Sequence, residues 1–256
     1  MCGHCSCGQP PAPEPPSRLV SLEENLLSRN DHLAAHNREH FQAAGVRVVN
    51  LLSSPGSGKT ALLEQLTALA PPGLRLAALV GDLATDNDAR RLQRAGLPAV
   101  QITTGQACHL EAAMVHRGLE ALEAAGHPLA SLDLLLIENV GNLVCPAAFD
   151  LGEHLRLVLL SVTEGEDKPL KYPATFQGAD LVVISKCDLA VAVDFDRPLA
   201  HRNVRQVAPG ARILEVSSRH GTGLQALWQA LVPTSTGPAA VPSTGSAAAI
   251  AEGTAG

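Results

Sequence analysis

The chain has 256 residues, 46% of them hydrophobic, and this length suits one large α/β domain with tails better than two full domains. Its formal net charge of −6 at pH 7 indicates no basic face, which argues against a general nucleic-acid binder. Because no apolar run reaches about 18 residues and no signal peptide pattern opens the sequence, we expect a soluble, cytoplasmic protein that does not insert into a membrane.

The first seven residues hold three cysteines, Cys2, Cys5 and Cys7, with His4 between them. In a reducing compartment such a cluster is typical of metal ligands rather than of disulfide partners. Thiolates with a nitrogen donor suit a square-planar Ni²⁺ site or a tetrahedral Zn²⁺ site, and the sequence leaves both open. Residues 1–8 are therefore predicted to be a metal-binding motif in which the role of His4 is undecided.

A spacer and a long helix follow the cysteine motif. Residues 9–17 (QPPAPEPPS) are predicted to be an extended proline-rich linker, and residues 18–44 a helix that leads into the domain. His32, His36 and His40 stand four residues apart, so they share one face of this helix. The pattern favours a solvated helix face, with an additional nickel store as the alternative.

A predicted strand, a glycine-rich loop and a predicted helix come next. Residues 46–52 have the apolar pattern of a buried strand, and residues 60–70 that of a helix. Between them, residues 53–60 (SSPGSGKT) begin with serine where the usual phosphate-binding pattern begins with glycine. Such a loop directs backbone N–H groups and a helix N-terminus at one point, which suits a phosphate chain.

The residue types of this loop predict individual roles. Lys59 is expected to contact the β- and γ-phosphates, and the hydroxyl of Thr60 to ligate Mg²⁺. The other predicted nucleotide contacts in the loop are Ser54, Pro55, Gly56, Ser57 and Gly58. The sequence therefore predicts a site for a nucleoside triphosphate.

The rest of the chain alternates apolar runs with helical patterns. The further predicted strands are 74–80, 99–102, 132–138, 156–162, 180–185 and 212–216, and the clearest helical patterns are 109–125 and 222–232. This alternation predicts an α/β P-loop NTPase fold, with a mostly parallel central sheet of about seven strands and helices on both faces. The domain is expected to span 18–232, and residues 233–256, which carry almost no charge, to be a disordered tail.

Acidic residues end two of these predicted strands. In P-loop folds the carboxylates that hold Mg²⁺ lie at strand ends near the phosphates, and Asp82 and Glu138 fit that position. Glu138 also opens a turn in which the Gly141 amide is expected to meet the γ-phosphate. We assign Asp88 to a helix N-cap and leave Asp86 open. The predicted catalytic residues are Lys59, Asp82, Glu138 and Gly141, and the predicted Mg²⁺ ligands are Thr60, Asp82 and Glu138.

The choice of base is expected to come from residues 185–188 (SKCD). The Asp188 carboxylate can accept hydrogen bonds from both N1–H and the 2-amino group of guanine, which adenine lacks, so GTP and GDP are favoured over ATP. The stem of Lys186 is expected to pack on the base. Ser185 stands where asparagine is usual, which leaves the strength of guanine selectivity open. The remaining predicted base contacts are Ser217, Ser218 and Arg219.

A second set of possible metal ligands lies inside the domain. Cys108 and His109 are adjacent, and Cys145 follows the Gly141 turn by four residues. On composition alone, buried and inert cysteines are the simpler interpretation. Three ligands on one chain would leave one coordination position for water, a partner or a second protomer.

Taken together, these segments resemble the HypB family, the nickel-incorporation GTPases of nickel–iron hydrogenase maturation and a SIMIBI-class branch of P-loop GTPases. The segments that carry the resemblance are SSPGSGKT (53–60), GDLATDND (81–88), CHL (108–110), ENVGNLVCP (138–146) and TEGEDKPLKYP (163–173), within about residues 19–232. Relatives in urease maturation have a proline between the cysteine and the histidine. The adjacency of Cys108 and His109 therefore favours the hydrogenase branch.

The resemblance implies roles for the metal-ligand candidates. It places Cys108, His109 and Cys145 in a Zn²⁺ or Ni²⁺ site at a GTP-dependent dimer interface. The N-terminal cysteines Cys2, Cys5 and Cys7 would then form a tighter nickel site. Lys168, in the last matching segment, is a contact of undetermined role.

The function implied by the resemblance is a GTP-hydrolysing nickel metallochaperone, a GTP-dependent homodimer that delivers nickel during maturation of nickel–iron hydrogenase. Its implied partners are the hydrogenase large-subunit precursor, a zinc-containing co-chaperone and a nickel-supplying prolyl isomerase. Because no glutamine follows Gly141, intrinsic turnover is expected to be slow. The alternatives are a P-loop small-molecule kinase and a nickel or zinc storage protein with a vestigial GTPase.

Overall fold

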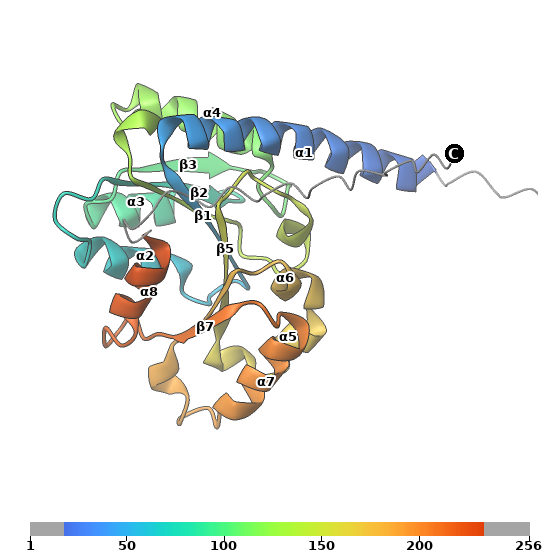
Figure 1. Ribbon diagram of the computed structural model, residues 1–256, viewed down its shortest axis with the longest axis vertical. Helices are drawn as coiled ribbons and strands as arrows, with labels where there is room; N and C mark the ends of the chain where they lie inside the picture. The colour runs from blue at the N-terminus through green and yellow to red at the C-terminus, as the bar shows by residue number, and fades with distance from the viewer. Residues whose placement is uncertain (1–17, 233–256) are drawn as a thin grey trace, which may run out of the picture.

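The computed structural model describes residues 18–232, so the predicted cysteine motif, the linker and the tail lie outside the described residues. Within that range seven strands form one sheet in the order β3-β2-β4-β1-β5-β6-β7, and every pairing is parallel (Figure 1). The strands are β1 (Arg47–Ser53), β2 (Leu76–Asp82), β3 (Ala99–Thr103), β4 (Leu134–Glu138), β5 (Leu155–Ser161), β6 (Leu181–Ser185) and β7 (Arg212–Glu215). The predicted sheet is confirmed.

Helices cover both faces of the sheet, as the sequence predicts. The helices of the described range are α1 (Arg18–Ala44), α2 (Lys59–Ala68), α3 (Asn87–Arg94), α4 (Ala112–Ala124), α5 (Lys168–Lys171), α6 (Pro173–Gln177), α7 (Arg197–Val207) and α8 (Leu224–Leu231). Side chains of β1 alternate between the two faces. Val49 and Leu51 pack with α2, α3 and α8. Val48 packs with α1 and α4, and Leu52 with α6 and α7.

The register brings the carboxyl ends of the central strands together. Glu138, the last residue of β4, lies opposite Leu51 of β1 and Val80 of β2. The loops that leave these three strands therefore meet at one edge of the sheet, where open α/β sheets bind ligands. This edge holds the phosphate loop and the acidic candidates.

One predicted helix begins later than the pattern at 109–125 indicates. Helix α4 starts at Ala112, because residues 104–111 form a loop that is fixed by its own hydrogen bonds. The Thr104 amide donates to the Asp82 carbonyl at 2.9 Å, and the Thr104 hydroxyl donates to the Ala107 carbonyl at 2.7 Å. Cys108 and His109 consequently lie in a loop rather than on a helix.

The long helix α1 packs along α4 and extends past the body of the domain (Figure 1). Buried asparagines fix this contact. Asn30 Oδ1 accepts from the Ala112 amide at 2.9 Å, and Asn37 Nδ2 donates to the Ala112 carbonyl at 3.0 Å. In the part of the chain that the structure describes, no helix combines the length and apolarity required to cross a bilayer.

We expect His154 to make folding stability depend on pH. The Val48 amide donates to His154 Nδ1 at 3.1 Å, which requires that nitrogen to be unprotonated. Burial, together with the charges of Arg47 and Arg38, lowers the pKa of His154 below its ordinary value. As the pH falls, the unfolded chain therefore protonates His154 at a higher pH than the folded chain does. The stability that neutral His154 contributes is present above about pH 6.5 and is lost as the pH falls below that value.

Urea unfolding between pH 5 and 8 tests this expectation. His154→Asn keeps an acceptor for the Val48 amide but does not titrate, so its stability should fall less between pH 7 and 5 than that of the wild type. His32→Asn, at an exposed position on α1, is the control. Equal slopes for the wild type and His154→Asn would contradict the assignment.

Candidate functional site: a phosphate loop beside a cysteine–histidine cluster

The loop between β1 and α2 has the shape of a phosphate cradle. Gly56 and Gly58 adopt φ angles of +74° and +99°, a region that side chains disfavour. The Ser57 hydroxyl closes the turn by donating to the Ser54 carbonyl at 2.9 Å. Helix α2 begins directly after Gly58, so the free N–H groups of its first turn face the loop.

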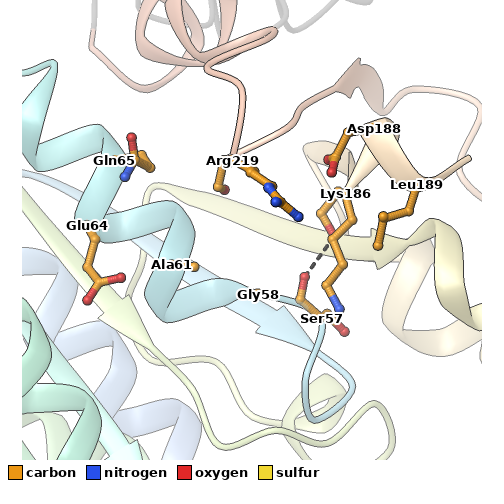
Figure 2. Close-up of a pocket in the computed structure, with 11 residues that line it drawn as sticks. Ser57, Gly58, Ala61, Glu64, Gln65, Lys186, Asp188, Leu189 and Arg219 are labelled. Atoms are coloured by element: carbon orange, nitrogen blue, oxygen red, sulfur yellow. Dashed lines mark hydrogen bonds between the residues drawn. The ribbon is translucent and has the colours of Figure 1, made fainter.

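Two cavities adjoin along this loop and share Gly58 and Ala61. The first, of about 380 Å³, is lined by the predicted residues Pro55, Gly56, Lys59, Thr60, Asp82, Glu138 and Gly141, and also by Asp88, Arg91 and Asn139. The second, of about 340 Å³, is lined by Ser57, Ser185, Lys186, Asp188, Ser218 and Arg219 (Figure 2). We call the first cavity the phosphate end and the second the base end, after the parts of a nucleotide that their residues are predicted to contact.

Glu138 and Thr60 form a buried pair at the phosphate end. The Thr60 hydroxyl donates to Glu138 Oε1 at 2.8 Å, and Glu138 is only 4% exposed. Burial raises the pKa of Glu138 to about 7, against the opposing effects of the Lys59 charge and the Thr60 hydrogen bond. Within residues 18–232, Oε2 of Glu138 is buried without a hydrogen-bond partner. A hydroxyl beside a carboxylate with a free oxygen is a donor set that fits Mg²⁺.

The charge of Lys59 acts on the same carboxylate. Its side chain is buried and Nζ donates to the hydroxyl of Ser53 at 3.0 Å. Burial lowers the pKa of Lys59, while the nearby carboxylates of Glu138 and Asp88 act in the opposite direction. The serine that replaces the usual first glycine of the loop therefore supplies a partner for the lysine.

Asp82 lies at the rim of the cavity and also holds its own loop. Oδ1 accepts from the amides of Ala84 and Thr85 at 3.0 and 2.7 Å. Partial burial acts to raise the pKa of Asp82, but these hydrogen bonds outweigh it and lower the pKa. A carboxylate that is committed to a turn through one oxygen has only the other one free for a cation or water.

The prediction that Asp88 caps a helix is wrong. Helix α3 begins at Asn87, so the capping position belongs to Asp86, whose carboxylate pairs with Arg90 at 2.8 Å. Asp88 lies in the first turn instead and lines the phosphate cavity with Arg91. The sequence pattern placed the cap two residues too late.

Gly141 allows the turn after β4 to contact the phosphate loop. A Cβ atom at this position would lie 2.9 Å from the Cα atom of Pro55, closer than real side chains permit. Only glycine fits this approach without moving the backbone. The turn that starts at Glu138 is therefore packed directly on the glycine-rich loop.

At the base end, Ser185 and Lys186 both bind the phosphate loop. The Ser185 hydroxyl donates to the Ser57 carbonyl at 2.8 Å, and Lys186 Nζ donates to the Gly56 carbonyl at 2.7 Å. Lys186 adopts a φ of +56°, which turns the chain at the end of β6 and lays its stem beside the loop (Figure 2). Ser185 thus takes the role of a tether between β6 and the loop.

Asp188 is held in position by the second predicted segment. The buried Ser217 hydroxyl donates to Asp188 Oδ1 at 2.6 Å, and this hydrogen bond lowers the pKa of Asp188. Ser218 and Arg219 lie across the same cavity, where Figure 2 shows Asp188 and Arg219 near Lys186. The structure brings residues 185–188 and 217–219 together around one pocket.

Cys108, His109 and Cys145 also come together. Their potential ligand atoms all lie within 4.8 Å of one another. His109 stacks on Phe149 with 3.8 Å between ring centroids, and burial lowers its pKa, which favours the neutral ring that a metal requires. A hydrogen bond with Cys145 raises the pKa of Cys108, so ion binding would release a proton. Two thiols and an imidazole suit Zn²⁺ or Ni²⁺.

Two asparagines that the sequence analysis missed connect this cluster to the nucleotide cavity. Asn139 follows Glu138 and lines the cavity, and its Oδ1 accepts from the Leu110 amide at 3.1 Å. Asn142 Nδ2 approaches the Cys108 carbonyl at 3.4 Å. The sequence could have indicated both asparagines, because they lie between the predicted site residues Glu138 and Cys145. The loop that carries Cys108 and His109 is thus hydrogen-bonded to the turn after β4.

The segment 163–173 contacts the phosphate loop through an acidic residue. Ser57 Oγ lies 3.0 Å from Glu164 Oε1, so its one hydroxyl proton can go to this carboxylate instead of the Ser54 carbonyl. Lys168 begins α5 and holds its ammonium group 5.1 Å from the ring centroid of Tyr172. Within the described residues Glu164, rather than Lys168, joins this segment to the loop.

The parallel sheet, the glycine-rich loop and the buried threonine–glutamate pair define a P-loop nucleotide-binding domain, here beside a cysteine–histidine cluster. The family model described as CobW/HypB/UreG, nucleotide-binding domain, matches residues 47–215. Together with the relatives described next, this match shows that the chain belongs to the HypB family of hydrogenase maturation factors, as the motifs indicate.

The relatives and solved structures share most of the chain. It is 50% identical to hydrogenase maturation factor HypB of Azotobacter chroococcum mcd 1, covering 81% of this chain and 67% of the relative. It is 44% identical to the hydrogenase/urease maturation factor HypB of Helicobacter pylori, covering 80% and 84%. The crystal structure of H. pylori HypB in complex with nickel matches with a TM-score of 0.74 and 43% identity over 78% and 91% of the chains. HypB of Archaeoglobus fulgidus matches with a TM-score of 0.71 and 40% identity over 78% and 95%.

Proposed function

We propose that this chain is a GTP-hydrolysing nickel metallochaperone that acts in the maturation of nickel–iron hydrogenase. The observation that carries the proposal is the hydrogen bond between Asn139, in the phosphate cavity, and the Leu110 amide, next to the cysteine–histidine loop. This hydrogen bond joins the cavity proposed for the nucleotide to the loop that carries the proposed metal ligands. The maturation-factor names of the relatives and the nickel in the H. pylori structure support the same assignment.

In this proposal the two cavities bind GTP along the phosphate loop. Asp188 accepts hydrogen bonds from guanine, while Ser217 keeps its carboxylate oriented. Lys59 exchanges the Ser53 hydroxyl for phosphate oxygens. Mg²⁺, held by Thr60 and Glu138, would neutralise charge on the β- and γ-phosphates. Because no glutamine follows Gly141, we expect turnover below about 10 s⁻¹, a typical value for metabolic enzymes.

The state of the nucleotide would control the metal cluster through the turn after β4. Contacts of this turn with the γ-phosphate are lost on hydrolysis, and Asn139 and Asn142 transmit the displacement to Leu110 and Cys108. Such coupling is reciprocal, so nickel at the cluster changes nucleotide affinity by the same factor. A tenfold effect requires only about 1.4 kcal/mol, comparable with one hydrogen bond.

The cluster also favours a GTP-dependent homodimer. Three protein ligands leave a coordination position that a second protomer can complete. Val144, next to Cys145, is 63% exposed, so an apolar side chain beside the cluster is accessible to a second protomer. The proposed partners are the hydrogenase large-subunit precursor and a maturation co-chaperone, with Cys2, Cys5 and Cys7 as a separate nickel-loading motif.

A nickel titration of Cys145→Ser tests the metal assignment. We expect the internal site to lose at least about tenfold in nickel affinity, because one of three ligands is removed, while GDP binding stays unchanged. Cys187→Ser is the matched control, since this cysteine lies outside the cluster. The assignment fails if Cys145→Ser and Cys187→Ser bind nickel alike.

A further inference from the structure

Three histidines from two helices meet on the face of the domain where α1 packs on α4. His36 and His40 lie four residues apart on α1, and His116 comes from α4. Their potential ligand atoms all lie within 4.8 Å of one another. His32, which shares the helical face in the sequence, is not a member of this cluster. The structure therefore groups His36 and His40 not with His32 but with His116, which lies 76 positions after His40 in the chain.

The ring geometry shows three converging imidazoles. The His36 and His40 centroids are 4.3 Å apart, and the His116 centroid lies 5.8 and 5.9 Å from them. Two ligands of one ion with metal–nitrogen distances of about 2.0–2.1 Å have their nitrogens at most about 4.2 Å apart, so a cluster held within 4.8 Å needs little adjustment. His36 and His40 are exposed, so rotation of their side chains can close the remaining gap.

The surroundings of His116 fit a ligand. Its Nδ1 atom is buried and lacks a hydrogen-bond partner among the described residues. Its other ring nitrogen, Nε2, lies 3.8 Å from Glu120 Oε1 on the next turn of α4. Metal-binding histidines commonly donate the second ring N–H to a carboxylate, which leaves the free nitrogen for the ion. Metal binding would give a partner to this buried, unpaired nitrogen, which belongs to a cluster with two exposed imidazoles.

We propose that His36, His40 and His116 bind a divalent transition-metal ion of borderline softness, Zn²⁺ or Ni²⁺, as a site separate from Cys108, His109 and Cys145. Imidazole nitrogens are the donors that these ions accept, and three of them leave one position for water. The bound ion fastens α1 to α4, the helix that begins directly after the cysteine–histidine loop. This inference does not depend on GTP hydrolysis or on nickel delivery.

The test uses the full chain with Cys2, Cys5, Cys7, Cys108 and Cys145 changed to serine, so that thiolate sites do not compete. Zn²⁺ and Ni²⁺ are titrated separately, and thermal unfolding is recorded with and without the ion. At a metal concentration of about 100 times Kd, we expect the melting temperature to rise by about 5–10 °C. Far-UV circular dichroism and GDP binding establish that each variant is folded.

In this background, His116→Gln and His40→Gln are compared with His32→Gln as the matched control on α1. We expect both cluster variants to lose at least about tenfold in affinity and to lose the thermal shift, while the control retains both. Because His40 is exposed, its substitution keeps the test valid if His116→Gln does not fold. The proposal is overturned if His40→Gln binds like the parent chain, or if His32→Gln weakens binding equally.

Discussion

Lys59→Ala is expected to reduce the rate of GTP hydrolysis by about 100-fold or more. Lys59 lines the phosphate cavity and its charge acts on Glu138, and positioned charges on a transferring phosphoryl group contribute effects of about this size. Phosphate release under single-turnover conditions measures the chemical step, and a separate GDP titration shows whether the protein still binds nucleotide. Lys171→Ala is the control, because this exposed lysine pairs with Asp167 on the surface.

The same variant separates the metallochaperone from a storage protein. If Lys59→Ala loses hydrolysis but supplies nickel to hydrogenase as well as the wild type, the GTPase is not required, and the storage interpretation gains support. If the variant keeps normal hydrolysis, the assignment of the phosphate cavity is wrong. The kinase alternative instead predicts GTP consumption that depends strongly on one small metabolite.

Asp188→Asn is expected to change base selectivity from guanine to xanthine. The proposed carboxylate accepts two hydrogen bonds from guanine, and bonds to charged groups contribute about 1.5–3 kcal/mol each, so GDP affinity should fall by about 100-fold or more. Xanthine carries a carbonyl in place of the 2-amino group. The side-chain NH₂ of an asparagine can donate a hydrogen bond to that carbonyl. Equilibrium titrations with GDP and XDP measure the change.

Two further variants serve as comparisons for Asp188→Asn. Ser217→Ala removes the hydroxyl that donates to Asp188, so it should weaken GDP binding less than Asp188→Asn and leave the base preference unchanged. Asp167→Asn, on the surface, should have no effect. Unchanged GDP affinity in Asp188→Asn would remove this residue from the base site.

The fold could be predicted because the inner strands β1, β2, β4, β5 and β6 are short, mostly apolar runs that are largely buried on both faces. In β1, Val48, Val49, Leu51 and Leu52 are all at most 1% exposed, so the strand appears in the sequence without any knowledge of its neighbours. The alternation of such runs with helices then implies parallel pairing. The phosphate loop is likewise local, since a few adjacent residues fix its conformation.

Contacts between distant residues could not be read in this way. The bond from Leu110 to Asn139 spans 29 positions, and His116 meets His36 only because α4 packs on α1. The capping prediction also failed at Asp88, since α3 begins at Asn87 and the capping position falls at Asp86, whose side chain makes no capping hydrogen bond. The sequence thus identified Cys108, His109 and Cys145 as potential ligands, whereas His116 and the connections between the sites required the fold.

The central claim is that nucleotide and nickel are coupled through the turn after β4. A competitive nickel titration, with the protein loaded with GDP or with a non-hydrolysable GTP analogue, tests it most directly. The account predicts that the site lost in Cys145→Ser shifts its nickel affinity at least about tenfold between the two nucleotides. In Asn139→Ala, which lacks the hydrogen bond to Leu110, nickel should bind but the shift should be strongly reduced. Equal nickel affinity in both nucleotide states of the wild type would contradict the account.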